Sequence, residues 1–239
     1  GLQGFLIEKG FADEYGILTL RDLDENADAI AAYDATDANP GNGVVDLMGC
    51  PEDWTCDNII NSMLVGGGYK NIVQVKAGYD PMWAQATDMV NEGLPVVAYT
   101  WTPSAYITTI RPGDNAYWLG MDYILDDSNP NNQEGGEGWD QRPGTAAIGE
   151  DMCPARSADG LCPIGWAAAD IQAAANNDFL AANPAAEELF LQIKLSVMDV
   201  SLANVEQAAG ADPRDLAAGW IADNRDKVDG WLDAARAAG

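Results

Sequence analysis

Short apolar runs alternate with helically spaced apolar positions along the first 120 residues. Apolar runs bounded by turn residues are typical of strands, whereas apolar residues three and four apart indicate one face of a helix. The pattern predicts strands at 4–8, 71–75, 94–99 and 117–119, and helices at 9–15, 19–32, 56–64, 80–92 and 103–109. Strands and helices in this order predict an α/β fold with a largely parallel sheet. Thr19, followed three residues later by Asp22, is expected to cap the second helix.

The pattern changes in the last third of the chain. Residues 126–162 contain clusters of Gly, Asn and Asp, which predict a long loop excursion. From Ala167 on, the composition becomes rich in alanine, and we expect helices at 184–198, 204–209 and 212–238, the last broken near Asp229 and Gly230. We therefore place a boundary near residues 163–175, between an α/β part and a mainly helical part.

Charge and composition exclude several classes of function. Twelve Lys and Arg against 38 Asp and Glu give a net charge of −26, which repels nucleic acid. No apolar run reaches about 18 residues, so we expect no direct membrane insertion. The chain has no histidine, the commonest general base, so we do not expect an enzyme. It begins at Gly1 without a basic and apolar leader, which predicts a processed product or a piece of something longer.

The four cysteines fall into two local pairs, Cys50 with Cys56 and Cys153 with Cys162. Local pairs in an acidic chain favour disulfides and an oxidising compartment. Structural zinc sites prefer cysteines about two to four residues apart, which neither pair matches. Zinc and free thiols remain alternatives, and we predict no metal or cofactor.

An acidic segment, residues 34–46, carries five oxygen-bearing side chains: Asp34, Asp37, Asn39, Asn42 and Asp46. Calcium loops concentrate such ligands, but the EF-hand spacing of acids and glycine is not met in any register. We expect a solvated turn here, with a calcium site as the alternative.

The loop between Cys50 and Cys56 combines two kinds of recognition group. Trp54 lies inside it, and Cys56 opens the predicted helix 56–64. Helix N-termini attract anions, and the face of an indole attracts cations. The loop therefore predicts a site for a small zwitterion. Trp101, at the end of a predicted strand, could supply another wall.

Residues 50–56 and 98–103 resemble the glycine betaine/proline-betaine substrate-binding proteins of ABC importers, the ProX type. Weaker similarity at 4–9, 34–50, 92–96 and 183–186 extends the resemblance over most of the chain. It implies a type II periplasmic binding protein-like α/β fold, with two lobes around a cleft and no catalytic activity. It also implies a periplasmic or other extracytoplasmic location, and ABC permease and ATPase subunits as partners.

The resemblance also assigns roles to single residues. Trp54 and Trp101 would be two walls of an aromatic box around the quaternary ammonium of a glycine betaine-like ligand. The N–H groups of Thr55 and Cys56 would hold its carboxylate, and Cys50–Cys56 would be the family's disulfide.

Two features depart from the family's pattern. The family has an additional N-terminal portion, with a third box tryptophan and a histidine, that this chain is expected to lack. Residues 1–165 would then be one complete lobe and residues 166–239 the helical half of the other. The pair Cys153 and Cys162 has no counterpart. Alternative functions are a receptor or sensor module for another small amine or amino acid, and a carbohydrate-active enzyme with paired carboxylates.

Overall fold

The computed structural model describes residues 1–123 and 144–239. They form two compact units, one of Gly1–Thr102 and Tyr106–Ala169, the other of Pro103–Ala105 and Asp170–Gly239. The predicted loop segments 126–132 and 135–138 lie outside the described residues. The two units are taken in turn.

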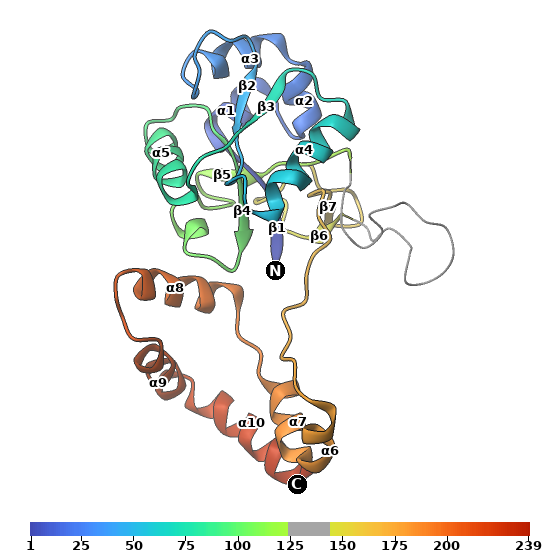
Figure 1. Cartoon of the computed structure of the whole chain (residues 1–239), viewed down its shortest axis with the longest axis vertical. Coiled ribbons are helices and arrows are strands. Elements are labelled where there is room, and N and C mark those ends of the chain that lie inside the picture. Colours follow the sequence, from blue (N-terminus) through green and yellow to red (C-terminus); the bar gives the residue numbers. More distant parts are fainter. Residues whose placement is uncertain (124–143) are drawn as a thin grey trace, which may run out of the picture. The chain divides into compact units, whose positions relative to one another are not determined.

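The first unit is built on a five-stranded sheet in the order β3-β2-β4-β1-β5. Its strands run through the middle of the unit in Figure 1, with α4 and α5 to either side in that view. Their bounds are β1 Leu2–Glu8, β2 Val45–Met48, β3 Ile72–Val75, β4 Val97–Thr102 and β5 Ala116–Trp118. A two-stranded ribbon, β6 Ala146–Ala147 with β7 Leu161–Cys162, lies outside this sheet.

The prediction of a largely parallel sheet is wrong. β2 pairs in parallel with β3 and β4, but β1 is antiparallel to both of its neighbours, β4 and β5. Periodicity identifies a strand and the face that it buries, but it carries no information about direction. The strand β2 was also missed, because its four residues follow directly on the acidic loop and include Asp46.

Most predicted helices of the first unit are present, but several of their bounds differ from those predicted. They are α1 Lys9–Tyr15, α2 Leu20–Glu25, α3 Ala27–Asp34, α4 Thr55–Gly67 and α5 Tyr79–Asn91. The capping box of Thr19 and Asp22 is confirmed. The single helix expected at 19–32 is wrong: it breaks at Asn26, whose side chain accepts from the N–H of Ala29 and so starts α3.

The helix expected at 103–109 is also wrong. Strand β4 continues to Thr102, and only Tyr106–Thr108 form one turn of 3-10 helix. The β-branched residues 107–110 have low helix propensity. Thr109 donates its hydroxyl to the Tyr106 carbonyl, which closes the turn locally.

One hydrophobic core fills the first unit. Strand β1 passes through its centre, and Phe5, Leu6 and Ile7 are almost fully buried. Because successive side chains of a strand point to opposite faces and residues 4–8 are all buried, both faces of β1 are covered. The edge strand β3 is buried only at its first residue, Ile72. This core holds the carboxyl ends of β2 and β4 in fixed positions.

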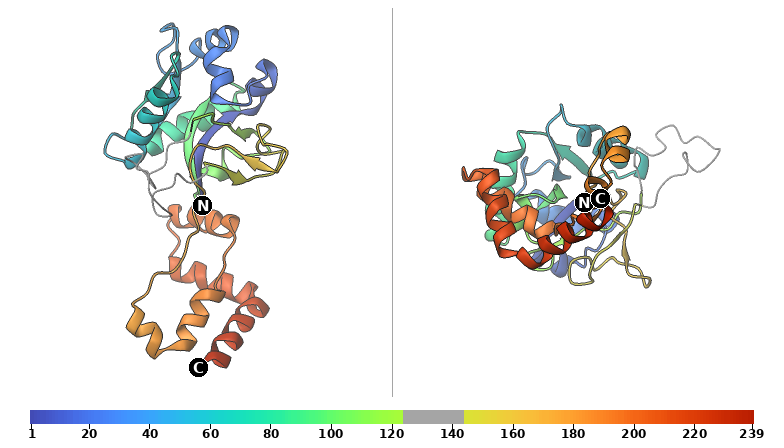
Figure 2. Two further views of the ribbon diagram at one scale, coloured as in Figure 1. Left: turned by 90° about the vertical axis from the view of Figure 1, so that its right-hand side faces the viewer. Right: turned by 90° about the horizontal axis from the view of Figure 1, so that it is seen from below.

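The described residues of the second unit form helices joined by short connections (Figure 2). These are α6 Asn177–Ala182, α7 Pro184–Gln192, α8 Val197–Ala208, α9 Pro213–Asp223 and α10 Arg225–Ala238. The helix expected at 184–198 ends at Gln192, since Ser196 caps a new helix through the N–H of Asp199. The predicted break near Gly230 is wrong: it lies at Asn224, which bonds the Trp220 carbonyl, and Gly230 continues α10.

Packing within the second unit is sparse. Trp220 and Trp231 stack with ring centroids 5.9 Å apart, and the Lys227 ammonium lies over both rings. The buried apolar residues there are Val228 and Ala235, whereas larger side chains such as Leu191 are exposed.

Candidate ligand-binding site

The two predicted tryptophan motifs meet at one edge of the sheet. Cys50 follows β2 closely, and Trp101 lies near the end of β4. Because these two strands are parallel neighbours, their carboxyl ends lie side by side, which is where open α/β sheets bind ligands. Both predicted cysteine pairings are confirmed: Cys50 is bonded to Cys56, and Cys153 to Cys162.

Trp54 and Trp101 are in contact. Their ring centroids are 5.8 Å apart and their planes make an angle of 66°, so two indoles form adjoining walls. Trp54 is 38% exposed and Trp101 is half-buried. This geometry offers an accessible indole surface beside a second ring.

Two tyrosines complete this aromatic cluster, and sequence reasoning missed both. Tyr79 lies with its ring centroid 5.3 Å from that of Trp54 and 5.0 Å from that of Trp101. Tyr106 lies 5.2 Å from Trp101 and 4.7 Å from Tyr79. A usable signal was the position of Tyr79 four residues after the strand 71–75, because residues there reach the same edge as Cys50 and Trp101.

Among the described residues, no side chain caps the first turn of α4. Trp54 is the N-cap residue and caps no N–H with its side chain. The N–H of Asp57 donates to the Trp54 carbonyl. Thr55 and Cys56 precede it, in positions whose N–H groups have no acceptor within a helix. The residues predicted to bind a carboxylate therefore stand at a helix start that carries the positive end of the dipole.

The acidic side chain in this turn is neutralised. Asp57 is buried, and its carboxylate lies 2.8 Å from the ammonium of Lys76, which follows β3. Asn61 also donates to the same carboxylate oxygen. The ion pair removes a negative charge that would repel an anion at the start of α4.

Gly49, directly before the disulfide loop, is required by close packing. A Cβ atom there would lie 2.4 Å from the Gln74 side chain, well inside van der Waals contact. The Gln74 amide is buried and has no hydrogen-bond partner among the described residues. The loop is thus seated against strand β3.

A carboxylate borders the aromatic cluster. The Tyr106 hydroxyl donates to Asp80 over 2.6 Å. Burial and this neighbouring carboxylate raise the pKa of Tyr106 to about 12. The phenol therefore stays neutral and remains a donor at physiological pH.

The acidic segment 34–46 proves to be a self-bonded loop. Asp37 and Asp46 are buried, so the expectation of a solvated turn is wrong for them. The Asp46 carboxylate accepts from the side chains of Asn39 and Asn42, and Asp37 accepts from the N–H of Asp46. Burial raises the pKa of Asp37. Among the described residues no group of acids is placed to hold a metal ion.

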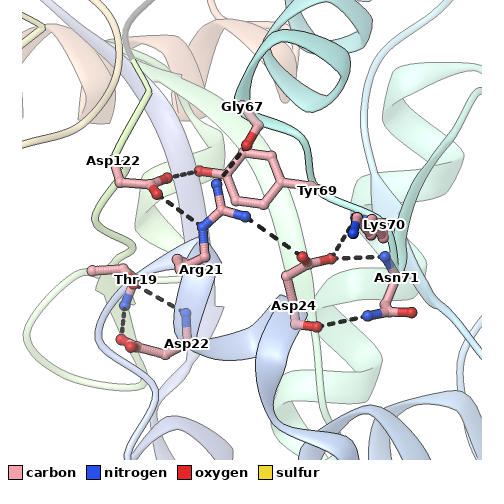
Figure 3. A network of polar contacts seen from close by, with 9 residues as sticks. All are labelled: Thr19, Arg21, Asp22, Asp24, Gly67, Tyr69, Lys70, Asn71 and Asp122. Atoms are coloured by element: carbon pink, nitrogen blue, oxygen red, sulfur yellow. Dashed lines mark hydrogen bonds and ion pairs between the residues drawn. The ribbon is translucent and has the colours of Figure 1, made fainter.

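An open groove of about 640 Å³ lies apart from the aromatic cluster and shares no residue with it. It is bordered by α2, α3 and the turn before β3; its lining includes Arg21, Asp24 and Lys70. Figure 3 shows that Arg21 is held by Asp122, Asp24 and the Gly67 carbonyl. Its guanidinium also lies over the Tyr69 ring, and Tyr69 donates to Asp122. Through these contacts Arg21 links separate segments of the fold.

One comparison decides the family. The model of the OpuAC family, described as the substrate-binding domain of the ABC-type glycine betaine transport system, matches residues 1–223. The chain belongs to this family. The resemblance seen in the two tryptophan motifs is thereby confirmed.

Individual relatives of the OpuAC chain agree. It is 30% identical, over 99% of its length, to the glycine betaine/proline betaine-binding periplasmic protein of Salmonella typhimurium, and equally so to that of Escherichia coli. It is 31% identical to the glycine betaine-binding periplasmic protein OusX of Dickeya dadantii. The chain spans 65% of the length of these relatives.

A solved structure supports the fold. An ABC-transporter choline-binding protein, determined with choline, aligns with this OpuAC-family chain at a TM-score of 0.51 and 16% identity. The alignment covers 100% of this chain and 66% of that one. The predicted type II periplasmic binding protein-like α/β fold is therefore confirmed. No helix in the described residues is long and apolar enough to cross a membrane.

Proposed function

We propose that this chain is the substrate-binding component of an ABC importer and captures glycine betaine or a closely related quaternary-ammonium zwitterion. It would act outside the cytoplasm, in the periplasm, and pass the ligand to the permease and ATPase subunits. It carries out no chemical step on its ligand. Family membership supports the class of protein, and the names of its relatives support the ligand.

One observation carries the choice of ligand: two indole walls adjoin the start of a helix without a side-chain cap. A trimethylammonium group has no N–H to donate, so contact with aromatic faces is the selective attraction available to it. A carboxylate suits the N–H groups of Thr55 and Cys56. In this proposal Trp54 and Trp101 hold the cation and the helix start holds the anion.

The described contacts set the expected strength. Each indole contributes up to about 2 kcal/mol to a desolvated cation, and the helix start up to about 2 kcal/mol to an anion. Their sum stays below about 6 kcal/mol, and ordering the ligand reduces it further. Because a dissociation constant of about 1 mM corresponds to about 4 kcal/mol, we expect this chain to bind in the millimolar range.

Heteronuclear NMR of the indole N–H groups tests the proposal. Glycine betaine should shift the signals of Trp54 and Trp101, but leave those of Trp220 and Trp231, whose rings already stack on each other. Trp54→Ala should abolish the effect, whereas the matched control Trp220→Ala should retain it.

Two further ligands separate the two halves of the site. In the isostere tert-butylacetate an uncharged quaternary carbon replaces the ammonium nitrogen, so it has the same shape and carboxylate but no cation. Choline has the cation but no carboxylate. Both should bind at least about tenfold more weakly than glycine betaine. Equal binding of the isostere would refute cation recognition, and unshifted Trp54 and Trp101 signals would refute the function.

A further inference from the structure

Tyr79 lies at the centre of the aromatic cluster but is itself withdrawn from solvent. It is the first residue of α5 and is only 4% exposed. Four aromatic rings surround it: those of Trp54, Trp83, Trp101 and Tyr106. A ring so covered does not itself meet a ligand, so its role must act through its neighbours.

Three rings form a continuous stack through Tyr79. Its plane is tilted by 20° from that of Trp54 at 5.3 Å, and by 16° from that of Trp83 at 5.9 Å. Trp83 follows one helical turn later in α5, and its indole N–H donates to Thr109. The lower two rings are thus anchored in the core, and Trp54 rests on them.

Trp54 needs such a support. It is exposed, it lies in a short loop, and it caps no N–H with its side chain. Tyr79 covers one face of its indole, which leaves the opposite face for a cation. The plane of Tyr79 therefore decides how Trp54 presents that face.

The hydroxyl of Tyr79 makes a second connection. It donates to the Tyr99 carbonyl over 2.7 Å, in a buried position. Tyr99 lies in β4, two residues before Trp101. One side chain thus contacts the ring of Trp54 and bonds the strand that carries Trp101.

We propose that Tyr79 is a positioning residue of the aromatic site. Its ring fixes the plane of Trp54, and its hydroxyl fixes that plane relative to the strand carrying Trp101. Two walls held at a set angle lose less conformational freedom when a ligand binds, which raises affinity without an added contact. The proposal rests on the proposed function for its ligand, but the positioning itself can be measured without one.

Two substitutions separate the ring from the hydroxyl. Tyr79→Phe keeps the stack and loses the bond to Tyr99, so glycine betaine should bind about three- to tenfold more weakly. Tyr79→Met keeps an apolar, adaptable side chain but removes the ring. It should weaken binding by at least about tenfold.

Tyr33 provides the matched control. It is a buried tyrosine of the same unit whose hydroxyl accepts from the N–H of Val97, and its aromatic contact is with Phe11. Tyr33→Phe and Tyr33→Met make the same chemical changes away from Trp54. They should lower the melting temperature but leave affinity within about twofold.

The ligand-free spectrum tests positioning by itself. Stacking on Tyr79 displaces the Trp54 indole signal through ring currents, and Tyr79→Met should move that signal toward the position of an exposed tryptophan. Tyr79→Phe should restore it. An unmoved Trp54 signal in Tyr79→Met would overturn the proposal, whether or not glycine betaine binds to the unaltered chain.

Binding decides the rest. Unweakened binding in folded Tyr79→Met would also overturn the proposal, while leaving the proposed function intact. If Tyr79→Met does not fold, Tyr79→Phe carries the test: affinity equal to that of Tyr33→Phe would overturn it. Absence of glycine betaine binding in the unaltered chain counts against the proposed function alone.

Discussion

The two units of this chain use apolar side chains differently. In the first, β1 is covered on both faces, and Phe5, Leu6 and Ile7 are buried. In the second unit, the helices leave Phe190, Leu191 and Met198 exposed. A helix buries its apolar stripe only against another layer of structure. The comparison shows that helix formation is a local property of the sequence, whereas a core depends on the layers that meet.

The largest expected difference between the units is in amide hydrogen exchange. Amides of β1 and β4 open only with the core, whereas those of α8 and α9 lie in sparsely packed helices. We expect exchange in α8 and α9 to be at least about a thousandfold faster. Mass spectrometry of peptides from both units measures this. Similar protection in the two units would contradict the prediction, because it would mean that α8 and α9 are packed as tightly as β1 and β4.

Two tryptophan substitutions sharpen the comparison. Trp118 is 2% exposed in the core of the first unit, whereas Trp220 stacks on Trp231 at the surface of the second. Trp118→Ala should cost about 3–5 kcal/mol in the free energy of unfolding. Trp220→Ala should cost less than about 1.5 kcal/mol.

Urea denaturation measures both variants: far-UV circular dichroism follows the helices of both units, and tyrosine emission follows the first unit alone. All eight tyrosines lie in the first unit, so this signal reports one unit only. A cost for Trp220→Ala as large as that for Trp118→Ala would contradict the contrast between packed and sparse regions.

The smallest expected effect is a displaced titration. Burial raises the pKa of Tyr79 and Tyr99, and that of Tyr106 to about 12, from the ordinary value of about 10. The folded state then retains protons that the unfolded state loses, so stability falls as the pH rises above about 10.

Phenolate absorbance against pH shows the delay. The titration of the folded chain should extend well above pH 10, and urea should return it to the ordinary range. Ionisation of every tyrosine near pH 10 in the folded chain would contradict the burial of these side chains. The second unit, which has no tyrosine, contributes nothing to this signal.

The parts of the fold that the sequence predicts are those decided by neighbouring residues. Thr19 and Asp22 predict a capping box, and the apolar run at 4–8 predicts β1. The direction of β1 does not follow from that run, because strand direction depends on connections elsewhere in the chain. Asn26 starts α3 and Asn224 ends α9 through hydrogen bonds of their own side chains, which helical periodicity alone does not reveal.

The candidate site divides in the same way. Trp54 and Trp101 stand in recognisable motifs, and their contact follows from two parallel strand ends. Tyr79 and Tyr106 have no motif of their own. The contacts of Tyr79 with Trp101 and Tyr106 join segments more than twenty residues apart in sequence, so only the folded structure brings them together.

The disulfide between Cys50 and Cys56 has a consequence for how α4 begins. α2 is started by Thr19, whose side chain occupies an N–H of the first turn. α4 has no such side-chain cap, and Cys56 in its first turn is bound covalently to Cys50 instead. A cap and an incoming carboxylate would compete for the same donors, whereas a sulfur bridge fixes the helix start without using any of them. The disulfide therefore holds the start of α4 in place and leaves its N–H groups available to a carboxylate.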